Sequence, residues 1–192
     1  HSMLTASLAE AAATAIGANA LLARVGAFYH DVGKLKRPIY FKENQRSGDN
    51  PHDALEPEKS AAVLTAHVRD GVLMLQKAKM PGEIISIAQE HHGSSLASFF
   101  YYNAVKRNGN QNLSEAPFRY AGPNPQTKES AIVSICDACE AAVHSLDNPS
   151  EEQIREMVNK IIRAKIEDGQ FDRAPVTLAD LGRIEASIMA TF

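Results

Sequence analysis

Two strong metal-ligand types stand side by side in the stretch FYHDVGK, residues 28–34, where His30 and Asp31 follow an apolar run and Lys34 comes three residues later. The chain holds seven histidines, at positions 1, 30, 52, 67, 91, 92 and 144. Taken singly, a histidine is more often a surface or satisfied core residue than a ligand. The setting of each histidine therefore decides its interpretation.

Several of these side chains lie in apolar segments. His30 follows the run GAFY, His67 lies in VLTAHV, His91 and His92 close IISIAQE, and Asp137 lies within AIVSICDACEAAV. Such settings predict partial burial, and a buried polar group without a partner costs about 1 to 3 kcal/mol. A single metal cluster would satisfy all of them.

The donor types indicate which metals to expect. Imidazole and carboxylate together suit zinc, iron or manganese, whereas calcium and magnesium take oxygen shells. A carboxylate can bridge two ions, and pairs of ions about 3.5 to 4 Å apart serve displacements at phosphorus. The sequence thus predicts a dinuclear centre with His30 and Asp31 as its hub.

The composition is that of one ordinary globular domain, which we place at residues 1–192. Of these residues 44% are hydrophobic, and the formal net charge of -3 gives no basic surplus for a DNA or RNA duplex or for a membrane surface. The chain contains no apolar run of about 18 residues, so we expect no membrane insertion of this piece. Cys136 and Cys139 share one apolar segment at helical spacing, which predicts core residues in a reducing cytoplasm.

Apolar periodicity and capping residues predict an all-α fold of six or more helices, with no strand-period segment. Two stretches rich in glycine, proline and polar residues, 34–57 and 108–126, predict long ordered loops on one side of the helical bundle, over the metal site. The expected helices span residues 4–16, 20–29, 57–79, 81–92, 127–145, 150–166 and 177–192.

The ordered donor set resembles a known family. The pattern H...HD...H...HH...D is that of the dinuclear HD-domain phosphohydrolases, and here it consists of His1, His30, Asp31, His67, His91, His92 and Asp137. The segments GAFYHDVGK, QEHHG, FRYAGPNPQTKE and DGQF resemble, over essentially the whole chain, the intracellular HD domain of seven-transmembrane HD proteins of the PgpH type.

This resemblance implies a phosphodiesterase that hydrolyses cyclic di-AMP to linear 5'-pApA through a hydroxide bridging two divalent transition metal ions, iron or manganese. It implies one ion held by His1, His30, Asp31 and Asp137, and a second held by Asp31, His67, His91 and His92. Asp31 and Lys34 would be catalytic, with the Lys34 ammonium also binding the phosphate.

The segment after the paired histidines offers candidate substrate-binding residues. HD-GYP proteins, which hydrolyse cyclic di-GMP, carry a GYP segment after the paired histidines, and FRYAGPNPQTKE occupies that stretch here. Within it, Arg119 and Lys128 are candidates for phosphate contacts and Gln126 for a base edge. His52 lies in the long loop without a supported role. His144 follows Asp137 by two helical turns, roughly 10 Å, and is interpreted as a surface residue.

Several alternatives stay open. His1 is either a tag remnant or native, and we treat it as native because it runs straight into an amphipathic helix. The chain is alternatively a phosphohydrolase of another cyclic dinucleotide or nucleotide, a catalytically silent nucleotide-sensing module, or a domain whose histidines are purely structural. The resemblance further implies tethering to transmembrane helices at the cytoplasmic face of a bacterial plasma membrane; a homodimer is open.

Overall fold

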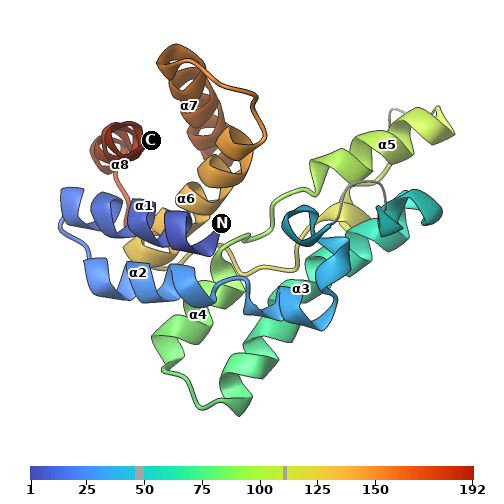
Figure 1. Ribbon diagram of the computed structural model, residues 1–192, viewed down its shortest axis with the longest axis horizontal. Helices are drawn as coiled ribbons and strands as arrows, with labels where there is room; N and C mark the ends of the chain where they lie inside the picture. The colour runs from blue at the N-terminus through green and yellow to red at the C-terminus, as the bar shows by residue number, and fades with distance from the viewer. Residues whose placement is uncertain (46–49, 110–111) are drawn as a thin grey trace.

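The computed structural model describes residues 1–45, 50–109 and 112–192, and within them the fold is all-α, as predicted (Figure 1). The described residues contain no strand, only an isolated bridge between Leu96 and Arg119. The α-helices are α1 Ser2–Ala15, α2 Ala20–Tyr29, α3 Pro57–Lys77, α4 Gly82–Glu90, α5 Ser98–Asn108, α6 Lys128–His144, α7 Glu151–Glu167 and α8 Leu178–Thr191.

Local signals account for most of these helix boundaries. Ser150 and Gln153 form a capping box at the start of α7, and Thr177 with Asp180 forms another at α8. The seven predicted helices are confirmed to within a few residues, the usual uncertainty of helix ends.

Helix α5 was not predicted. Its sequence, SFFYYNAVKRN, is rich in aromatic residues of modest helix propensity. Packing supplies what propensity lacks, because Phe100 and Tyr101 are buried in a small core with Phe118. Gly109 ends the helix at φ +64°, in the left-handed conformation that favours glycine.

The first predicted loop is a series of short 3-10 turns. These are η1 Val32–Lys36, η2 Pro38–Tyr40, η3 Lys42–Asn44 and η4 Pro51–Ala54, and a further turn, η5 Ala116–Phe118, lies in the second loop. Both loops lie on the α3 and α5 side of the molecule (Figure 1). Residues 46–49 and 110–111 of the predicted loops lie outside the described residues.

The helices pack around separate cores. The largest joins α1, α2, α6, α7 and α8, and its fully buried side chains include Leu8, Ile135 and Ile184. Cys136 and Cys139 are free thiols buried in it, which confirms their predicted place in the core. A second core joins α3, α5 and η5, and a third joins α3 to α4. Helix α4 contacts α2, α3 and α6, so it links the two sides of the molecule.

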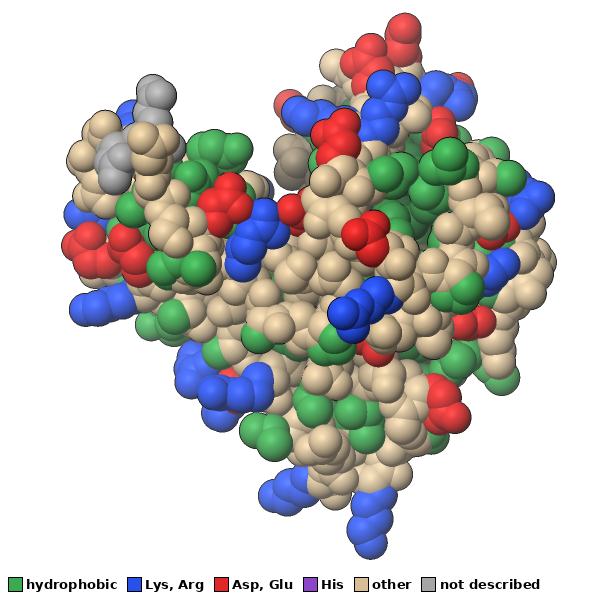
Figure 2. Space-filling model, turned by 180° about the vertical axis from the view of Figure 1, so that it is seen from behind, with side chains coloured by type: hydrophobic (Ala, Val, Ile, Leu, Met, Phe, Trp, Pro, Cys, Tyr) green, Lys and Arg blue, Asp and Glu red, His purple; other side chains and the backbone are tan. Residues whose placement is uncertain are grey.

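The surface carries both signs of charge. Figure 2 shows Lys and Arg side chains interspersed with Asp and Glu over the rear face, among scattered hydrophobic groups. None of the described helices combines the length and the apolar character that crossing a membrane would require.

Candidate metal centre

The ends of two helices and the middles of two others bring the predicted donors together. His30 and Asp31 directly follow the last residue of α2, and His91 and His92 directly follow α4. His67 lies within α3, Asp137 within α6, and His1 precedes α1 as its N-cap. These donors lie where the first core meets α3 and α4.

The backbone of η1 approaches α3 closely enough to require glycine. A Cβ atom on Gly33 would lie 1.9 Å from the carbonyl oxygen of His67 and 2.4 Å from the backbone nitrogen of Gly71. No side chain fits such a gap between two backbones. Gly33 therefore sets the distance at which Asp31 faces His67.

The donor atoms form two groups that share one residue. Asp31, His67, His91 and His92 make one group, and His1, His30, Asp31 and Asp137 make the other. Within each group the ligand atoms all lie within 4.8 Å of one another. These groups have the membership that the resemblance implied; that they hold ions stays a proposal.

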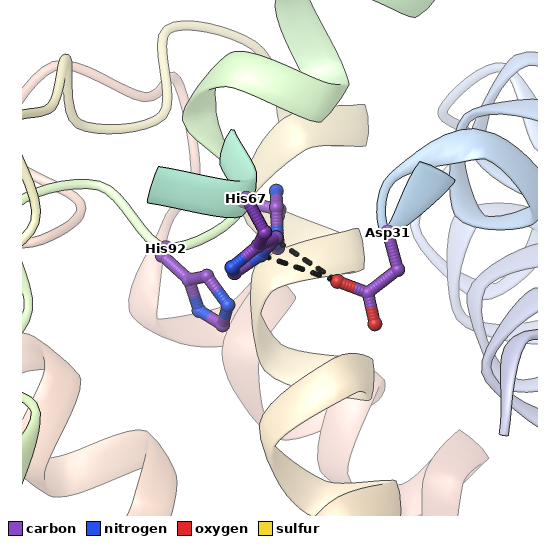
Figure 3. A group of neighbouring side chains, drawn as sticks. Asp31, His67 and His92 are labelled. Atoms are coloured by element: carbon purple, nitrogen blue, oxygen red, sulfur yellow. Dashed lines mark hydrogen bonds and ion pairs between the residues drawn. The ribbon is translucent and has the colours of Figure 1, made fainter. Parts of the chain in front are cut away.

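The two oxygens of Asp31 face different groups. Oδ1 lies 3.3 Å from Nε2 of His67 and 3.7 Å from Nε2 of His91, whereas Oδ2 lies 3.2 Å from Nε2 of His30 and 3.4 Å from Nε2 of His1. Figure 3 shows the Asp31 carboxylate directed at the histidines from a separate segment of the chain. This is the arrangement a bridging carboxylate requires.

Asp137 completes the group of His1 and His30. Its Oδ1 lies 3.0 Å from Nε2 of His1 and 3.3 Å from Nε2 of His30, and its Oδ2 lies 3.8 Å from Nδ1 of His92. Asp137 is therefore near both groups, although only Asp31 belongs to both.

Three of the histidines are oriented in the same way. Each has Nδ1 within 2.6 to 2.8 Å of the backbone carbonyl three residues earlier, so that Nδ1 donates and Nε2 is the nitrogen that faces the site. The pairs are His30 with Ala27, His67 with Leu64, and His91 with Ala88.

His1 is oriented by a side chain instead. Its Nδ1 donates to the carboxylate of Glu140, and its Nε2 faces Asp31 and Asp137. Glu140 is only 4% exposed and lies one helical turn after Asp137 on α6. A carboxylate that holds the second nitrogen of a ligating histidine is a recurrent feature of metal sites.

The residues fit a pair of metal ions. Both carboxylate oxygens of Asp31 are buried and have no partner in hydrogen-bonding geometry among the described residues, although Nζ of Lys34 lies 2.5 Å from Oδ2. Ions between Asp31 and the Nε2 atoms would bind these oxygens directly, and the nitrogen and oxygen donors suit first-row divalent metals.

The electrostatics agree with a site that requires positive charge. Burial disfavours protonation of His1 and His30, but Asp31 and Asp137 outweigh it and raise the pKa of His1 to about 11 and that of His30 to about 10. Burial would raise the pKa of both aspartates, but the neighbouring imidazoles hold it well below the usual value. Without ions, protons compensate the two carboxylates.

His91 and His92 behave in the opposite way. Burial lowers the pKa of His91 to about 4, and burial together with the charge of His91 lowers that of His92. Both rings are therefore neutral at physiological pH, which is the form that binds metals.

Lys34 lies beside the donors. Its Nζ contacts Asp31 Oδ2 at 2.5 Å and Glu43 Oε1 at 2.7 Å, above the ring of Phe41. Burial disfavours its charge, but the charge of Asp31 prevails and raises the pKa of Lys34. The ammonium is therefore retained next to the carboxylate.

A cavity of about 520 Å³ opens above the donors, within the size range of small-molecule sites. The donors His1, His67, His92 and Asp137 line it together with Lys34, and other lining residues are Lys42, Leu64, Tyr120, Ala141 and His144. The ring of Tyr120 stacks on that of His92, with centroids 4.2 Å apart and planes inclined by 28°. Tyr120 thus forms a wall next to the second donor group.

The three predicted substrate contacts lie outside this cavity. Arg119 binds the carboxylates of Glu115 and Asp168 and the carbonyl of Ser94, so its guanidinium ties the second loop to the turn after α7. Nζ of Lys128 lies 3.4 Å from Asp180, and Nε2 of Gln126 donates to the carbonyl of Asn124. The cavity gives no support to their predicted roles, which stay predictions.

Sequence reasoning missed Glu140 and Tyr120. Glu140 stands three residues after Asp137, the spacing of side chains on one helix face, and this signal was available in the sequence. Tyr120 lies in an irregular loop, where no periodicity reports what a side chain faces. Glu90 beside the paired histidines is buried and accepts a hydrogen bond from the backbone of Gln126 at 3.0 Å.

The remaining histidines differ from each other. His144 is exposed, as predicted, but it also lines the cavity. His52 does not line it; its Nε2 lies 3.0 Å from the carbonyl of Tyr40, between the rings of Tyr40 and Phe100. His52 therefore joins η4 to η2.

The fold and donor set define the class of the protein. The family model of the HD domain matches residues 1–142, and the chain belongs to the HD domain family.

Comparison with individual proteins narrows the relationship. The chain is 51% identical over 191 residues to the cyclic-di-AMP phosphodiesterase PgpH of Bacillus subtilis (strain 168) and 48% identical to that of Listeria monocytogenes serotype 1/2a (strain 10403S). Each match covers 100% of this chain but 27% and 26% of the relative, so the chain spans about a quarter of their length.

A solved structure matches over the whole chain. The HD domain of the L. monocytogenes phosphodiesterase PgpH, crystallised in complex with cyclic-di-AMP, superimposes with a TM-score of 0.96 at 48% sequence identity. The match covers 100% of this chain and 88% of that one. The similarity therefore extends over the arrangement of the complete fold.

Proposed function

We propose that this chain is a phosphodiesterase domain that uses two divalent metal ions to hydrolyse cyclic di-AMP to linear 5'-pApA. The observation that carries the proposal is the carboxylate of Asp31, buried without a hydrogen-bonding partner and facing a different histidine group with each oxygen, beneath an open cavity. The substrate is supported by the 48% identical HD domain whose structure contains cyclic-di-AMP.

The proposed metal ligands form the same two groups as the donor atoms in the structure. His1, His30, Asp31 and Asp137 would hold one ion, and Asp31, His67, His91 and His92 the other. When bound, the ions would supply a water of lowered pKa and neutralise charge on the phosphoryl oxygens. We propose iron or manganese because the donors are imidazoles and carboxylates.

The chain's own groups position the reaction. Asp31 faces both donor groups with its two oxygens, and the close contact of Gly33 with α3 places the segment that carries it. The Lys34 ammonium is next to Asp31 and lines the cavity, so it would donate to a nonbridging oxygen of the scissile phosphate. Tyr120 and Leu64 line the cavity beside the donors.

The setting in the cell is also a proposal. Because the PgpH relatives are much longer than this chain, we propose that it is the cytoplasmic domain of a bacterial plasma-membrane protein. Its partner would then be the transmembrane remainder of the same protein.

The test is direct. The protein is incubated with cyclic di-AMP and either Mn²⁺ or anaerobic Fe²⁺, and the products are separated by chromatography, with cyclic di-GMP and nucleotides as competing substrates. We expect linear 5'-pApA with one of the metals, and its loss in Asp31→Asn but not in the exposed control Asp147→Asn. Absence of linear product with both metals would disprove the proposed activity.

Two further measurements separate the alternatives. A sensing module would bind cyclic di-AMP tightly without turnover, which isothermal titration calorimetry beside the product assay would reveal. Purely structural histidines would leave gently purified protein free of transition metal, which elemental analysis would reveal.

A further inference from the structure

A cyclic dinucleotide has two phosphodiester groups on opposite sides of one ring, and only one of them can be at the donors during cleavage. The donor groups extend below the surface of the cavity, since His30 is fully buried and Asp31 is 9% exposed. The second phosphodiester must therefore lie further out, towards the opening.

We infer that Lys42 binds this second phosphodiester. The inference rests on the proposed function, because only a substrate with two phosphates requires such a contact. Lys42 is exposed and lines the same cavity as Lys34 and the donors. It is the first residue of η3, in the first of the two long loops.

The other charged groups around the cavity are already paired. Glu43 is paired with Lys34, Glu140 holds His1, and Lys34 itself contacts Asp31. Among the residues that the structure describes, no hydrogen bond or ion pair engages the side chain of Lys42. An anion entering the cavity would therefore meet Lys42 as an uncompensated positive charge.

The position of Lys42 is nevertheless well determined by its neighbours. Phe41 is 4% exposed and packs edge-on against the ring of His67, with centroids 5.5 Å apart. On the other side, Glu43 is held by Lys34 at 2.7 Å. Both flanking residues are thus anchored next to the donors, and the backbone between them holds Lys42 at the cavity while its side chain stays available.

The different surroundings of Lys34 and Lys42 indicate different roles. Lys34 is half-buried and contacts Asp31, so it belongs with the phosphate that reacts. Lys42 is exposed, so its contribution is to binding rather than to the chemical step. A contact made equally in the ground state and the transition state lowers KM and leaves kcat unchanged.

The experiment compares a substrate with two phosphates and a substrate with one. Steady-state kinetics of the metal-loaded protein are measured with cyclic di-AMP and with bis(p-nitrophenyl) phosphate, which has a single phosphodiester. For Lys42→Ala we expect KM for cyclic di-AMP to rise about tenfold, the effect of one charge-assisted hydrogen bond at a partly exposed site. The ratio of kcat/KM for cyclic di-AMP to that for the small diester falls by the same factor.

Two control variants are measured beside Lys42→Ala. Lys77→Ala removes an exposed positive charge from the last turn of α3, at a lysine that does not line the cavity, and should leave the ratio unchanged. Lys42→Arg keeps the charge and should restore most of the wild-type ratio. Metal content is measured for each variant to show that the centre is loaded.

The outcomes are distinct. An unchanged ratio in Lys42→Ala, or an equal loss with both substrates, would overturn the inference while leaving the phosphodiesterase intact. Failure of the wild-type protein to hydrolyse cyclic di-AMP, with the small diester still cleaved, would instead overturn the proposed substrate, and the role of Lys42 with it.

Discussion

Glu140→Gln should weaken one of the two metal sites and spare the other. Glu140 holds Nδ1 of His1, whose Nε2 faces Asp31 and Asp137 in the first donor group. His30 and the second group are oriented by backbone carbonyls, which the substitution does not change. The variant keeps the size of the side chain and removes its charge.

The magnitude follows from the burial of this contact. Because Glu140 is 4% exposed, solvent does little to screen its charge from the imidazole. Loss of such an orienting carboxylate typically costs 10- to 100-fold in metal affinity, or about 1.4 to 2.7 kcal/mol. Glu140 is the last of the groups that raise the pKa of metal-free His1, so the accompanying decrease in proton competition offsets only a small part.

The assay is a chelator-buffered Mn²⁺ titration with metal content read by mass spectrometry. We expect two binding steps in the wild-type protein, and only one of them to shift in Glu140→Gln. Glu156→Gln, an exposed glutamate on α7, serves as the charge-matched control. Equal shifts of both steps, or no shift, would show that Glu140 does not support an individual ion.

Four other outcomes follow from the site. Gly33→Ala should lower the free energy of unfolding by about 3 kcal/mol, because its Cβ would meet the carbonyl of His67. The control Gly82→Ala, whose Cβ would have nothing within 4 Å, should not destabilise the protein. Equal melting temperatures of the two variants in thermal denaturation would contradict the expected clash. At pH 7 the metal-free His1 and His30 are protonated, with pKa values of about 11 and about 10, so loading should release about two protons, seen by calorimetry in buffers of different ionisation enthalpy. Because protonated His1 and His30 are favoured in the fold, they stabilise the metal-free protein fully below about pH 6.5, and this stabilisation is lost as the pH rises through 10 to 11. A melting temperature of the metal-free protein that stays unchanged between about pH 6.5 and 11 would argue against the raised pKa values. A chelator should lower the melting temperature of the loaded protein, and no change on re-addition of Mn²⁺ would speak against a bound metal.

The helices and the donor set were accessible from sequence because both depend on local patterns. Apolar periodicity marks the buried face of a helix, and donors such as Asp137 stand out because they interrupt it. Helix α5 was missed because its stability comes from contacts of Phe100 and Tyr101 with residues distant in sequence. Periodicity within so short and aromatic a segment carries too little information.

The predicted substrate contacts show a different limit. Arg119 was chosen for its charge, but its charge is also what Glu115 and Asp168 bind in the folded chain. A sequence shows that a cationic side chain is present, but it does not show which carboxylates pair with it in the folded chain. Lys42 lies in a loop with no motif of its own, so the sequence does not mark it as a phosphate ligand. The structure does, because its neighbours Phe41 and Glu43 contact His67 and Lys34 while its own side chain remains available.

The placement of the donors links the proposed chemistry to the architecture. His1, His30 and Asp137 come from helices of the first core, whereas His67 comes from α3, which packs in the second and third cores. Ions in these groups would therefore join helices that belong to different cores. Asp31 lies at their junction, where its carboxylate is buried beside the ammonium of Lys34 and the imidazoles of both donor groups. Ions bound there by the folded chain alone would stabilise it, so the residue expected to hold both ions for catalysis is also the one through which metal binding stabilises the domain.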